Sequence, residues 1–367
     1  MKKIGEIFEY INKPLLSFYL NIKMIGNKYN YAFIDGSFLL TRNLWVATKD
    51  KKPEEMNPGE VIRITLQTIN KLYRDYNIGA DKVLMIFDEW SRDLAPNAGY
   101  IRSYMIKDYV QYKGSRKFVT EQTVEDMKAD PNTKPEDLER AIHELAVNKI
   151  KFQTKKIIRE EFKNLGIPYF SWPGYEFDDI ATLASFGLNG QTEKPNVIIT
   201  KDSDLMYSLC PGCDQFLLPT RGSEPQTVTY NEMYYKIPEV LRNKGLGLYM
   251  YHAYCDSLGI TGHNDNLKTI KSGHDGTQAI LNIMNGDYSD VEKVDAFKAQ
   301  MRSFDLSCFP QVDQVNNMIQ NEFGTAGKIG TLDDFKDFCV RHGVKGISDS
   351  YYNGLSCRFD VKLFSGK

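Results

Sequence analysis

Short apolar runs alternate with longer stretches of helical periodicity along this chain. Three runs, at 31–34, 82–87 and 197–200, have the length and the β-branched composition of strands buried on both faces of a sheet. Between the first two runs, residues 60–77 place apolar side chains on one face of a helix, which indicates a βαβ unit with parallel strands. The pattern predicts an α/β fold with a mostly parallel central sheet flanked by helices.

The remaining segments add mainly helices to this sheet. In chain order we expect an amphipathic helix over 1–28, a polar loop with Pro53 and Pro58, a mobile, proline-broken connection over 119–136, a helix over 139–165, a short strand over 167–170, a peripheral hairpin over 215–230, and mainly helix beyond 231.

Acidic residues recur where the predicted strands end. Asp35 and Asp88 each follow a strand, and the third strand runs into Asp202 and Asp204. Taken alone, this last pair indicates an acidic loop that caps the next helix. The segment 176–179, EFDD, opens another apolar helix with three more acids. Because the carboxyl ends of parallel strands meet at one edge of a sheet, the recurrence predicts a shared cleft.

A shared cleft of carboxylates requires compensating cations. Two ionised carboxylates about 4 Å apart repel each other by roughly 4 kcal/mol at an effective dielectric constant near 20. Oxygen-only ligands select hard ions, and sparse carboxylates with retained water suit Mg²⁺ or Mn²⁺. Two such ions would activate a water molecule and stabilise the leaving oxygen in a phosphodiester hydrolysis.

A basic and aromatic stretch over 100–117 is the second chemical signal. It carries five cations against one acid, with tyrosines between them. Such a surface suits a phosphate backbone with stacking bases, although a solvated helix face with half-buried tyrosines has the same pattern. The cations, with the tyrosine beside them, are Arg102, Lys107, Tyr112, Lys113, Arg116 and Lys117.

Composition limits the alternatives. The 367 residues are 42% hydrophobic and 26% charged, with a net charge of −2, so any nucleic-acid site must be a local patch. No apolar run is long enough to span a membrane, and charged residues interrupt the N-terminal stretch, which predicts a cytoplasmic protein. Six cysteines indicate a reduced compartment. Cys210 and Cys213 with His252 and Cys255 would complete a zinc set, or they are ordinary thiols in a turn and a helix.

Five motifs together resemble the 5′-nucleases of tailed bacteriophages, which include phage ribonuclease H. Flap endonucleases and the 5′-nuclease domain of bacterial DNA polymerase I are more distant relatives. The motifs, in order, are FIDGS at Asp35, IFDEW at Asp88, YKGSRK from Tyr112, GYEFDDIA with Glu176 and Asp178, and TKDSDL with Asp202 and Asp204.

The resemblance implies a two-metal site. Asp35, Asp88, Glu176, Asp178 and Asp202 would surround the first Mg²⁺, for which Mn²⁺ would substitute. Asp204 would approach the second ion with a later Asp pair, for which Asp256 and Asp265 are the candidates. The family's glycine-rich hairpin is reduced here to LKTIKSGHDG, so the resemblance does not decide whether this chain keeps the family's potassium site. Asp179 is expected to cap its helix rather than bind metal.

The resemblance also assigns the basic residues. Lys113 and Arg116 would orient the scissile phosphate and act in catalysis with Asp178 and Asp202. The residues expected to contact nucleic acid are Arg102, Lys107, Tyr112, Lys113, Arg116, Lys117, Lys268 and Lys271.

Fold and function follow as expectations. The family has a PIN-like core with a helical arch and a helical C-terminal subdomain, here containing a divergent helix-three-turn-helix. The boundaries are 1–28 for an extension, 29–230 for the core with an arch at about 100–150, and 231–367 for the subdomain. We expect a monomeric 5′-to-3′ exonuclease and flap endonuclease that removes RNA primers and 5′ flaps from DNA and RNA–DNA hybrids. Single-strand-binding protein or a sliding clamp would recruit it.

Two alternatives stay open. One is a DNA-binding protein on the same fold that has lost catalysis. The other is a generic phosphate-handling α/β protein, although the chain has no Gly-rich phosphate loop.

Overall fold

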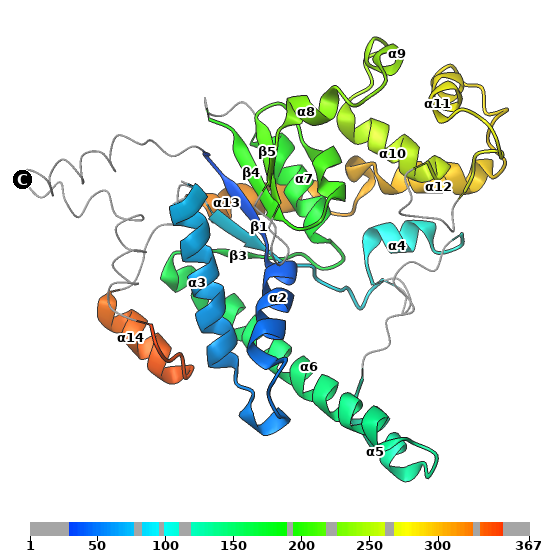
Figure 1. The fold of residues 1–367 in the computed structure, drawn as a ribbon. Coiled ribbons are helices and arrows are strands. Elements are labelled where there is room, and N and C mark those ends of the chain that lie inside the picture. Colours follow the sequence, from blue (N-terminus) through cyan, green and yellow to red (C-terminus); the bar gives the residue numbers. More distant parts are fainter. Residues whose placement is uncertain are drawn as a thin grey trace, which may run out of the picture.

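A central sheet with helices on both faces forms the body of the protein (Figure 1). The computed structural model describes residues 29–76, 83–94, 99–109, 119–188, 194–217, 226–260, 268–325 and 331–347. The helix expected over 1–28 lies outside these residues. Among the described helices, none is long and apolar enough to cross a membrane.

The sheet has six strands in the order β3-β2-β1-β4-β5-β6. All neighbouring pairs are parallel except β5 and β6, which are antiparallel. The expected mostly parallel sheet is therefore confirmed. The strands are β1 (Ala32–Asp35), β2 (Val83–Ile86), β3 (Tyr169–Phe170), β4 (Asn196–Thr200), β5 (Cys213–Leu217) and β6 (Gln226–Val228).

Alternate residues of the strands face two separate apolar cores. On β1, Ile34 packs with helices α2, α3, α6 and α14, whereas Phe33 packs on the opposite side with α7, α10, α12 and α13. Every residue of β1, β2 and β4 is buried, because helices cover both faces. The helices that cover the first face are α2 (Gly36–Thr48), α3 (Pro58–Tyr76), α6 (Pro135–Glu161) and α14 (Leu332–Arg341). Those on the second face include α7 (Phe177–Gly187), α10 (Leu248–Leu258), α12 (Val294–Ser303) and α13 (Val312–Thr325).

Shorter elements complete the chain. They are η1 (Pro53–Glu55), α4 (Ile101–Ile106), α5 (Glu121–Ala129), η3 (Phe162–Leu165), η4 (Asp204–Ser208), α8 (Tyr230–Tyr234), α9 (Glu239–Arg242), α11 (Gly276–Met284) and η6 (Leu306–Cys308). The boundary predicted between core and C-terminal subdomain after residue 230 stays a prediction.

Helix α2 was missing from the sequence expectation, which placed only a polar loop before the helix at 60–77. The structure has a helix directly after β1, and the Asp35 side chain caps it by accepting from the backbone N–H of Phe38 at 2.8 Å. Leu39, Leu40 and Leu44 bury its inner face. The cap and this apolar face together explain the helix.

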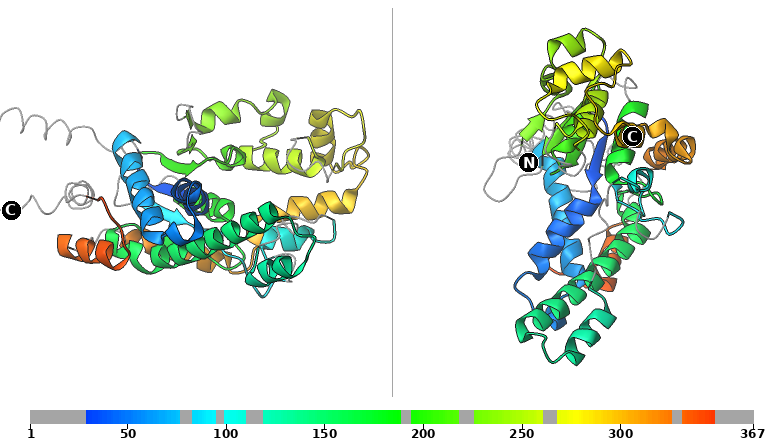
Figure 2. Two further views of the ribbon diagram at one scale, coloured as in Figure 1. Left: turned by 60° about the horizontal axis from the view of Figure 1, so that its bottom comes forward. Right: turned by 90° about the vertical axis from the view of Figure 1, so that its right-hand side faces the viewer.

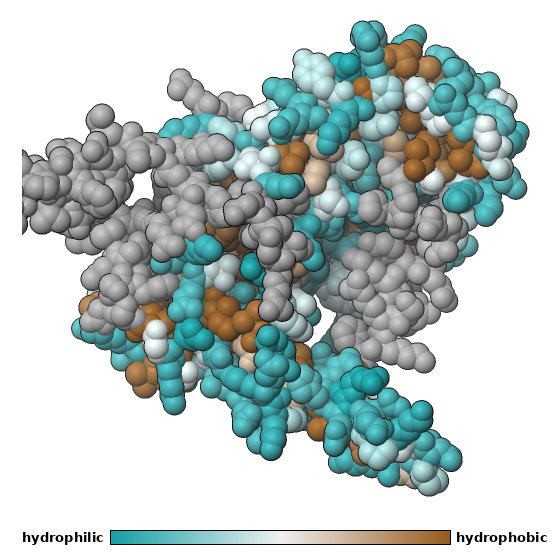
Figure 3. Space-filling model, in the orientation of Figure 1, coloured by the Kyte–Doolittle hydropathy of each residue, from teal (hydrophilic) through white to brown (hydrophobic). Residues whose placement is uncertain are grey.

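The segment over 119–136, expected as a mobile connection, instead forms α5 and the start of α6. Thr120 caps α5, and Lys149 of α6 forms an ion pair with Glu121 of α5 at 2.7 Å. The two helices lie side by side, and α5 with the adjoining end of α6 extends away from the sheet in Figure 1 and in the right-hand view of Figure 2. Mostly hydrophilic residues cover this projection (Figure 3). Pro131 and Pro135 fall at the turn and at the first residue of α6, where proline is tolerated.

The hairpin expected over 215–230 is present as β5 and β6. It is less peripheral than expected, because β5 extends the parallel sheet by pairing with β4 along its whole length.

Candidate active site

The strand order locates the most probable position for a ligand. β1 has β2 on one side and β4 on the other, so the chain reverses its direction of winding across the sheet at β1 and β4. In open parallel sheets, ligands occupy the crevice at such a switch point, beyond the carboxyl ends of the strands. Asp35 is the last residue of β1, and Asp202 lies two residues past the end of β4.

Asp35 is held in a buried position by two hydrogen bonds. Its carboxylate accepts from the backbone N–H of Phe38 at 2.8 Å and from Thr200 Oγ1 at 2.9 Å. Burial and, to a lesser extent, the neighbouring Asp88 and Asp202 together raise the pKa of Asp35 to about 7, although its two hydrogen bonds act to lower it. Asp35 is thus an acid that a bound cation would stabilise in its ionised form.

Asp88 connects β2 to both neighbouring helices. Its backbone N–H donates to Ser37 Oγ at 3.0 Å, and its carboxylate Oδ1 accepts from the backbone N–H of Phe177 at 2.7 Å. Lys155 of α6 donates to the Asp88 carbonyl at 2.9 Å and lies 3.3 Å from Glu89 Oε2. The acid at the end of β2 therefore has a fixed position at the start of α7.

The first turn of α7 contributes two further acids. Glu176 is the N-cap residue, and Asp178 lies within the first turn. Burial raises the pKa of Asp178 well above its usual range, as do Glu176 and Asp202, while Arg102 lowers it. Asp179 accepts from the backbone N–H of Glu176 at 3.0 Å, so its predicted capping role is confirmed.

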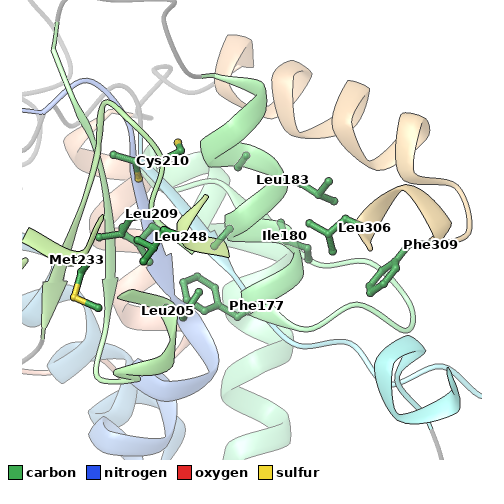
Figure 4. Packing of buried hydrophobic residues seen from close by; sticks show 14 of the residues in the cluster. Phe177, Ile180, Leu183, Leu205, Leu209, Cys210, Met233, Leu248, Leu306 and Phe309 are labelled. Carbon is green, nitrogen blue, oxygen red and sulfur yellow. The ribbon is translucent and has the colours of Figure 1, made fainter. Parts of the chain in front are cut away.

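The apolar face of α7 anchors these acids. Phe177, Ile180 and Leu183 point into the core of the second face, where Leu205 and Leu306 from other elements surround the helix (Figure 4). The start of α7 is thereby fixed relative to the sheet.

Asp202 lies near acids at the end of β1 and at the start of α7. It raises the pKa of both Asp35 and Asp178, which are contributed by different elements. Its backbone N–H donates to Thr200 Oγ1 at 3.1 Å, and its Oδ1 accepts from the backbone N–H of Asp204 at 3.0 Å. Unlike Asp35, Asp202 is exposed. We call Asp35, Asp88, Glu176, Asp178 and Asp202 the acidic cluster.

The candidate ligands for a second metal come from separate elements. Asp204 begins η4, beside which α10 packs. Asp256 of α10 is buried, and its Oδ2 accepts from Gln300 Nε2 of α12 at 2.7 Å. Asp265 lies outside the described residues. The pairing of Asp204 with either residue at a second ion stays a prediction.

Arg102, which is expected to contact nucleic acid, has a side chain that is only 17% exposed and is engaged by residues of α7 and α10. Its Nε donates to Asp179 at 2.5 Å and its Nη2 to Tyr249 Oη at 3.3 Å, while the guanidinium lies 5.0 Å from the ring centre of Phe304. Burial alone lowers the pKa of Arg102, but Asp179 and the other anions nearby hold it well above its usual value.

Four of the other residues expected to contact nucleic acid lie outside the described residues: Tyr112, Lys113, Arg116 and Lys117. Lys107 is exposed, with its Nζ 4.4 Å from the ring centre of Tyr104. Lys268 and Lys271 are exposed on a short segment where Ile270 bridges to Val291. Binding of nucleic acid by these residues stays a prediction.

The three cysteines of the possible zinc set, Cys210, Cys213 and Cys255, are free buried thiols. Cys210 and Cys213 both contact Ser185, through its carbonyl at 3.5 Å and its Oγ at 3.4 Å. Burial raises the pKa of Cys210 and of Cys255 to about 11. The ring of His252 stacks on Tyr207 with centroids 4.6 Å apart. These contacts match the ordinary-thiol alternative.

The acidic cluster fits a hard divalent cation by its chemistry. Its donors are carboxylate oxygens, two of them with raised pKa values that a cation would lower. Within the described part of the chain, no three acidic, histidine or cysteine side chains already converge on one ion position. Mg²⁺ commonly binds one or two carboxylates directly and keeps several water molecules, so such a preformed cage is not required.

Comparisons with known proteins find only distant structural likenesses. No family model matches the chain, and no curated protein matches its sequence. A bacteriophage T5 protein co-crystallised with metal ions is 16% identical, with a TM-score of 0.48, over 80% of this chain and 99% of the other. Bacteriophage T5 5′-exonuclease with bound zinc is 15% identical, with a TM-score of 0.40, over 90% and 100%. The catalytic core of Rad2 with a DNA substrate is 12% identical, with a TM-score of 0.41, over 91% and 94%.

Several supporting residues escaped the sequence analysis. Ser37 lies in the motif FIDGS and Thr200 in the segment VIITKDSD, each within two residues of an acid. A hydroxyl so close to an acid could have been predicted from the sequence to support the site. Lys155 and Gln300 reach the acids from helices far away in sequence, and no local pattern marks them.

Proposed function

We propose that this protein is a divalent-metal-dependent 5′-nuclease that hydrolyses phosphodiester bonds of DNA at 5′ ends and 5′ flaps. The observation that carries the proposal is the acidic cluster. Asp35, Asp88 and Asp202 lie at the carboxyl ends of three neighbouring parallel strands, and Glu176 and Asp178 lie at the start of α7. The pKa values of two of these five acids, Asp35 and Asp178, are raised, so ionising the group without a bound cation would cost free energy.

The side chains divide the work of the site. Asp35, Asp88, Asp178 and Asp202 would hold the first Mg²⁺, with Glu176 behind them, and Mn²⁺ would replace it. Mg²⁺ supplies an activated water and neutralises charge on the phosphate. Thr200 keeps Asp35 in place through its 2.9 Å hydrogen bond. Ser37 orients the backbone of Asp88 at 3.0 Å. A second ion would use Asp204 with Asp256 or Asp265.

The basic residues would provide the nucleic-acid contacts. Lys113 and Arg116 would bind the scissile phosphate and stabilise the charge that develops on it, since fixed cations lower such barriers. Lys107, Lys268 and Lys271 would bind the phosphate backbone elsewhere. These contacts should make binding fall steeply with salt. RNA–DNA hybrids are the second proposed substrate, which would suit primer removal during replication.

The decisive experiment is cleavage of an end-labelled 5′-flap duplex by purified protein with Mg²⁺ or with EDTA. We expect product only with the metal, and none from Asp202→Ala under either condition. Asp202→Ala should still bind the flap substrate within about threefold of wild type, because phosphate contacts dominate affinity.

A different result would favour another function. Tight flap binding by the wild-type protein without any Mg²⁺- or Mn²⁺-dependent product would replace the proposal with a structure-specific DNA-binding protein. Equal cleavage by Asp202→Ala would remove the acidic cluster from the reaction.

A further inference from the structure

Arg102 of α4, whose side chain is only 17% exposed, lies close to two acids of the acidic cluster, Glu176 and Asp178. Arg102 of α4 forms its ion pair with Asp179 at 2.5 Å, and the Asp179 side chain is fully buried. The same Asp179 accepts from the backbone N–H of Glu176 at 3.0 Å. One carboxylate therefore joins the arginine to the first turn of α7, which presents Glu176 and Asp178.

Arg102 also fastens this turn to two helices of the C-terminal half. Its Nη2 donates to Tyr249 of α10, whose hydroxyl donates in turn to the carbonyl of Phe304 at 2.9 Å. The guanidinium lies 5.0 Å from the Phe304 ring, a distance suited to a cation–π contact. Helix α4 itself packs on α12.

We propose that Arg102 is a positioning residue: through Asp179 it fixes the first turn of α7, and so sets where Glu176 and Asp178 meet a metal ion. This role differs from the phosphate contact that its place in a basic stretch predicts. The guanidinium donates to a carboxylate and to a phenol and lies against a ring face, so all three of these contacts hold it to other parts of the protein. The effect of Arg102 on catalysis rests on the proposed function, whereas its effect on stability does not.

The first test is a double-mutant cycle on the stability of the metal-free protein. Arg102→Met and Asp179→Asn each leave one buried charge without its partner, so each should lower the Tm by about 5 °C. The double variant should lose clearly less than the sum of the two. Arg102→Lys keeps the positive charge but lacks the planar, forked set of N–H donors, so its Tm should lie between those of Arg102→Met and wild type. A strictly additive cycle would overturn the proposal.

The second test measures the metal centre without using cleavage. Mn²⁺ affinity is measured by electron paramagnetic resonance in the absence of DNA, at a temperature where every variant is folded. We expect the double variant to bind Mn²⁺ about tenfold more weakly than wild type, because the α7 acids lose their anchor. The net charge near the site is unchanged in this variant, so electrostatics alone predicts no difference. Mn²⁺ affinity equal to wild type would contradict the positioning role.

Lys107→Met is the matched control, since it removes an exposed cation that directly follows α4. It should leave the Tm and the Mn²⁺ affinity unchanged while weakening flap binding in EDTA. Arg102→Met should show the opposite pattern, with flap binding within about twofold of wild type. Weaker flap binding by Arg102→Met at an unchanged Tm would identify it as a substrate contact and overturn the proposal. A wild-type protein that binds Mn²⁺ but cleaves nothing would reject the proposed function while leaving the stability cycle interpretable.

Discussion

Replacing Asp35 with asparagine should stabilise the metal-free protein, although it removes a proposed metal ligand. The side chain is buried, and burial with its acidic neighbours raises its pKa from an ordinary 3.8 to about 7. Between these values the folded protein binds more protons than the unfolded chain. Stability therefore falls as the pH rises through this window and is lowest above it.

The size of the effect follows from the same pKa. Each pKa unit corresponds to about 1.4 kcal/mol, so the raised pKa of Asp35 destabilises the fold by about 4 kcal/mol at pH 8, where the folded side chain is ionised, and by about 1.5 kcal/mol at pH 5, where it is protonated. The amide retains an oxygen for the N–H of Phe38 but no longer accepts from Thr200, which costs about 1.5 kcal/mol. The net gain is about 2.5 kcal/mol at pH 8 and close to zero at pH 5, or about 3 °C in Tm at the higher pH.

Thermal unfolding of wild type and Asp35→Asn in EDTA at pH 5 and pH 8 measures this difference. Asp50→Asn is the control, because Asp50 has an 83% exposed side chain and should change the Tm at neither pH. Mg²⁺ at pH 8 should raise the Tm of wild type more than that of Asp35→Asn. A lower Tm for Asp35→Asn by the same amount at both pH values would show that its hydrogen bonds outweigh its burial and refute the reasoning.

Three further substitutions test the surroundings of the site. Gly36→Ala would place a Cβ 2.4 Å from the Phe87 ring, so it should displace the start of α2, lower the Tm by several degrees and reduce cleavage. Thr200→Val removes the donor to Asp35, and should cost about 1 kcal/mol at pH 8 but less at pH 5, as measured by denaturant unfolding. Lys113→Ala should lower the turnover number at saturating flap substrate more than it weakens duplex binding, and an unchanged turnover number would exclude Lys113 from catalysis.

The sequence predicted the sheet because its strands are strongly marked. The runs at β1, β2 and β4 are apolar and β-branched, and the acids at their ends lie at one edge of the sheet because strand ends coincide in a parallel sheet. Helix α2 was harder to predict, since Trp45 and Val46 expose apolar surface on the side opposite Leu44 and blur the helical period.

Contacts across the fold were beyond the reach of sequence patterns. Arg102 and Asp179 are 77 residues apart, and the arginine stands in a stretch whose composition indicates a basic surface. Only the contacts of its side chain with Asp179 and Tyr249 in the fold show that it turns toward α7 and α10. For the same reason the partner of Asp256 was not predicted, because Gln300 comes from α12.

The central claim is that the acidic cluster binds the catalytic metal, and a crystal soaked in Mn²⁺ tests it most directly. The account predicts an anomalous difference peak at the carboxyl ends of β1 and β4, within about 2.3 Å of a carboxylate oxygen of Asp35 or Asp202 and in reach of Asp88 and Asp178 through ligands or water. The same peak should be absent from crystals of Asp202→Ala. Mn²⁺ bound only elsewhere on the wild-type protein would contradict the account.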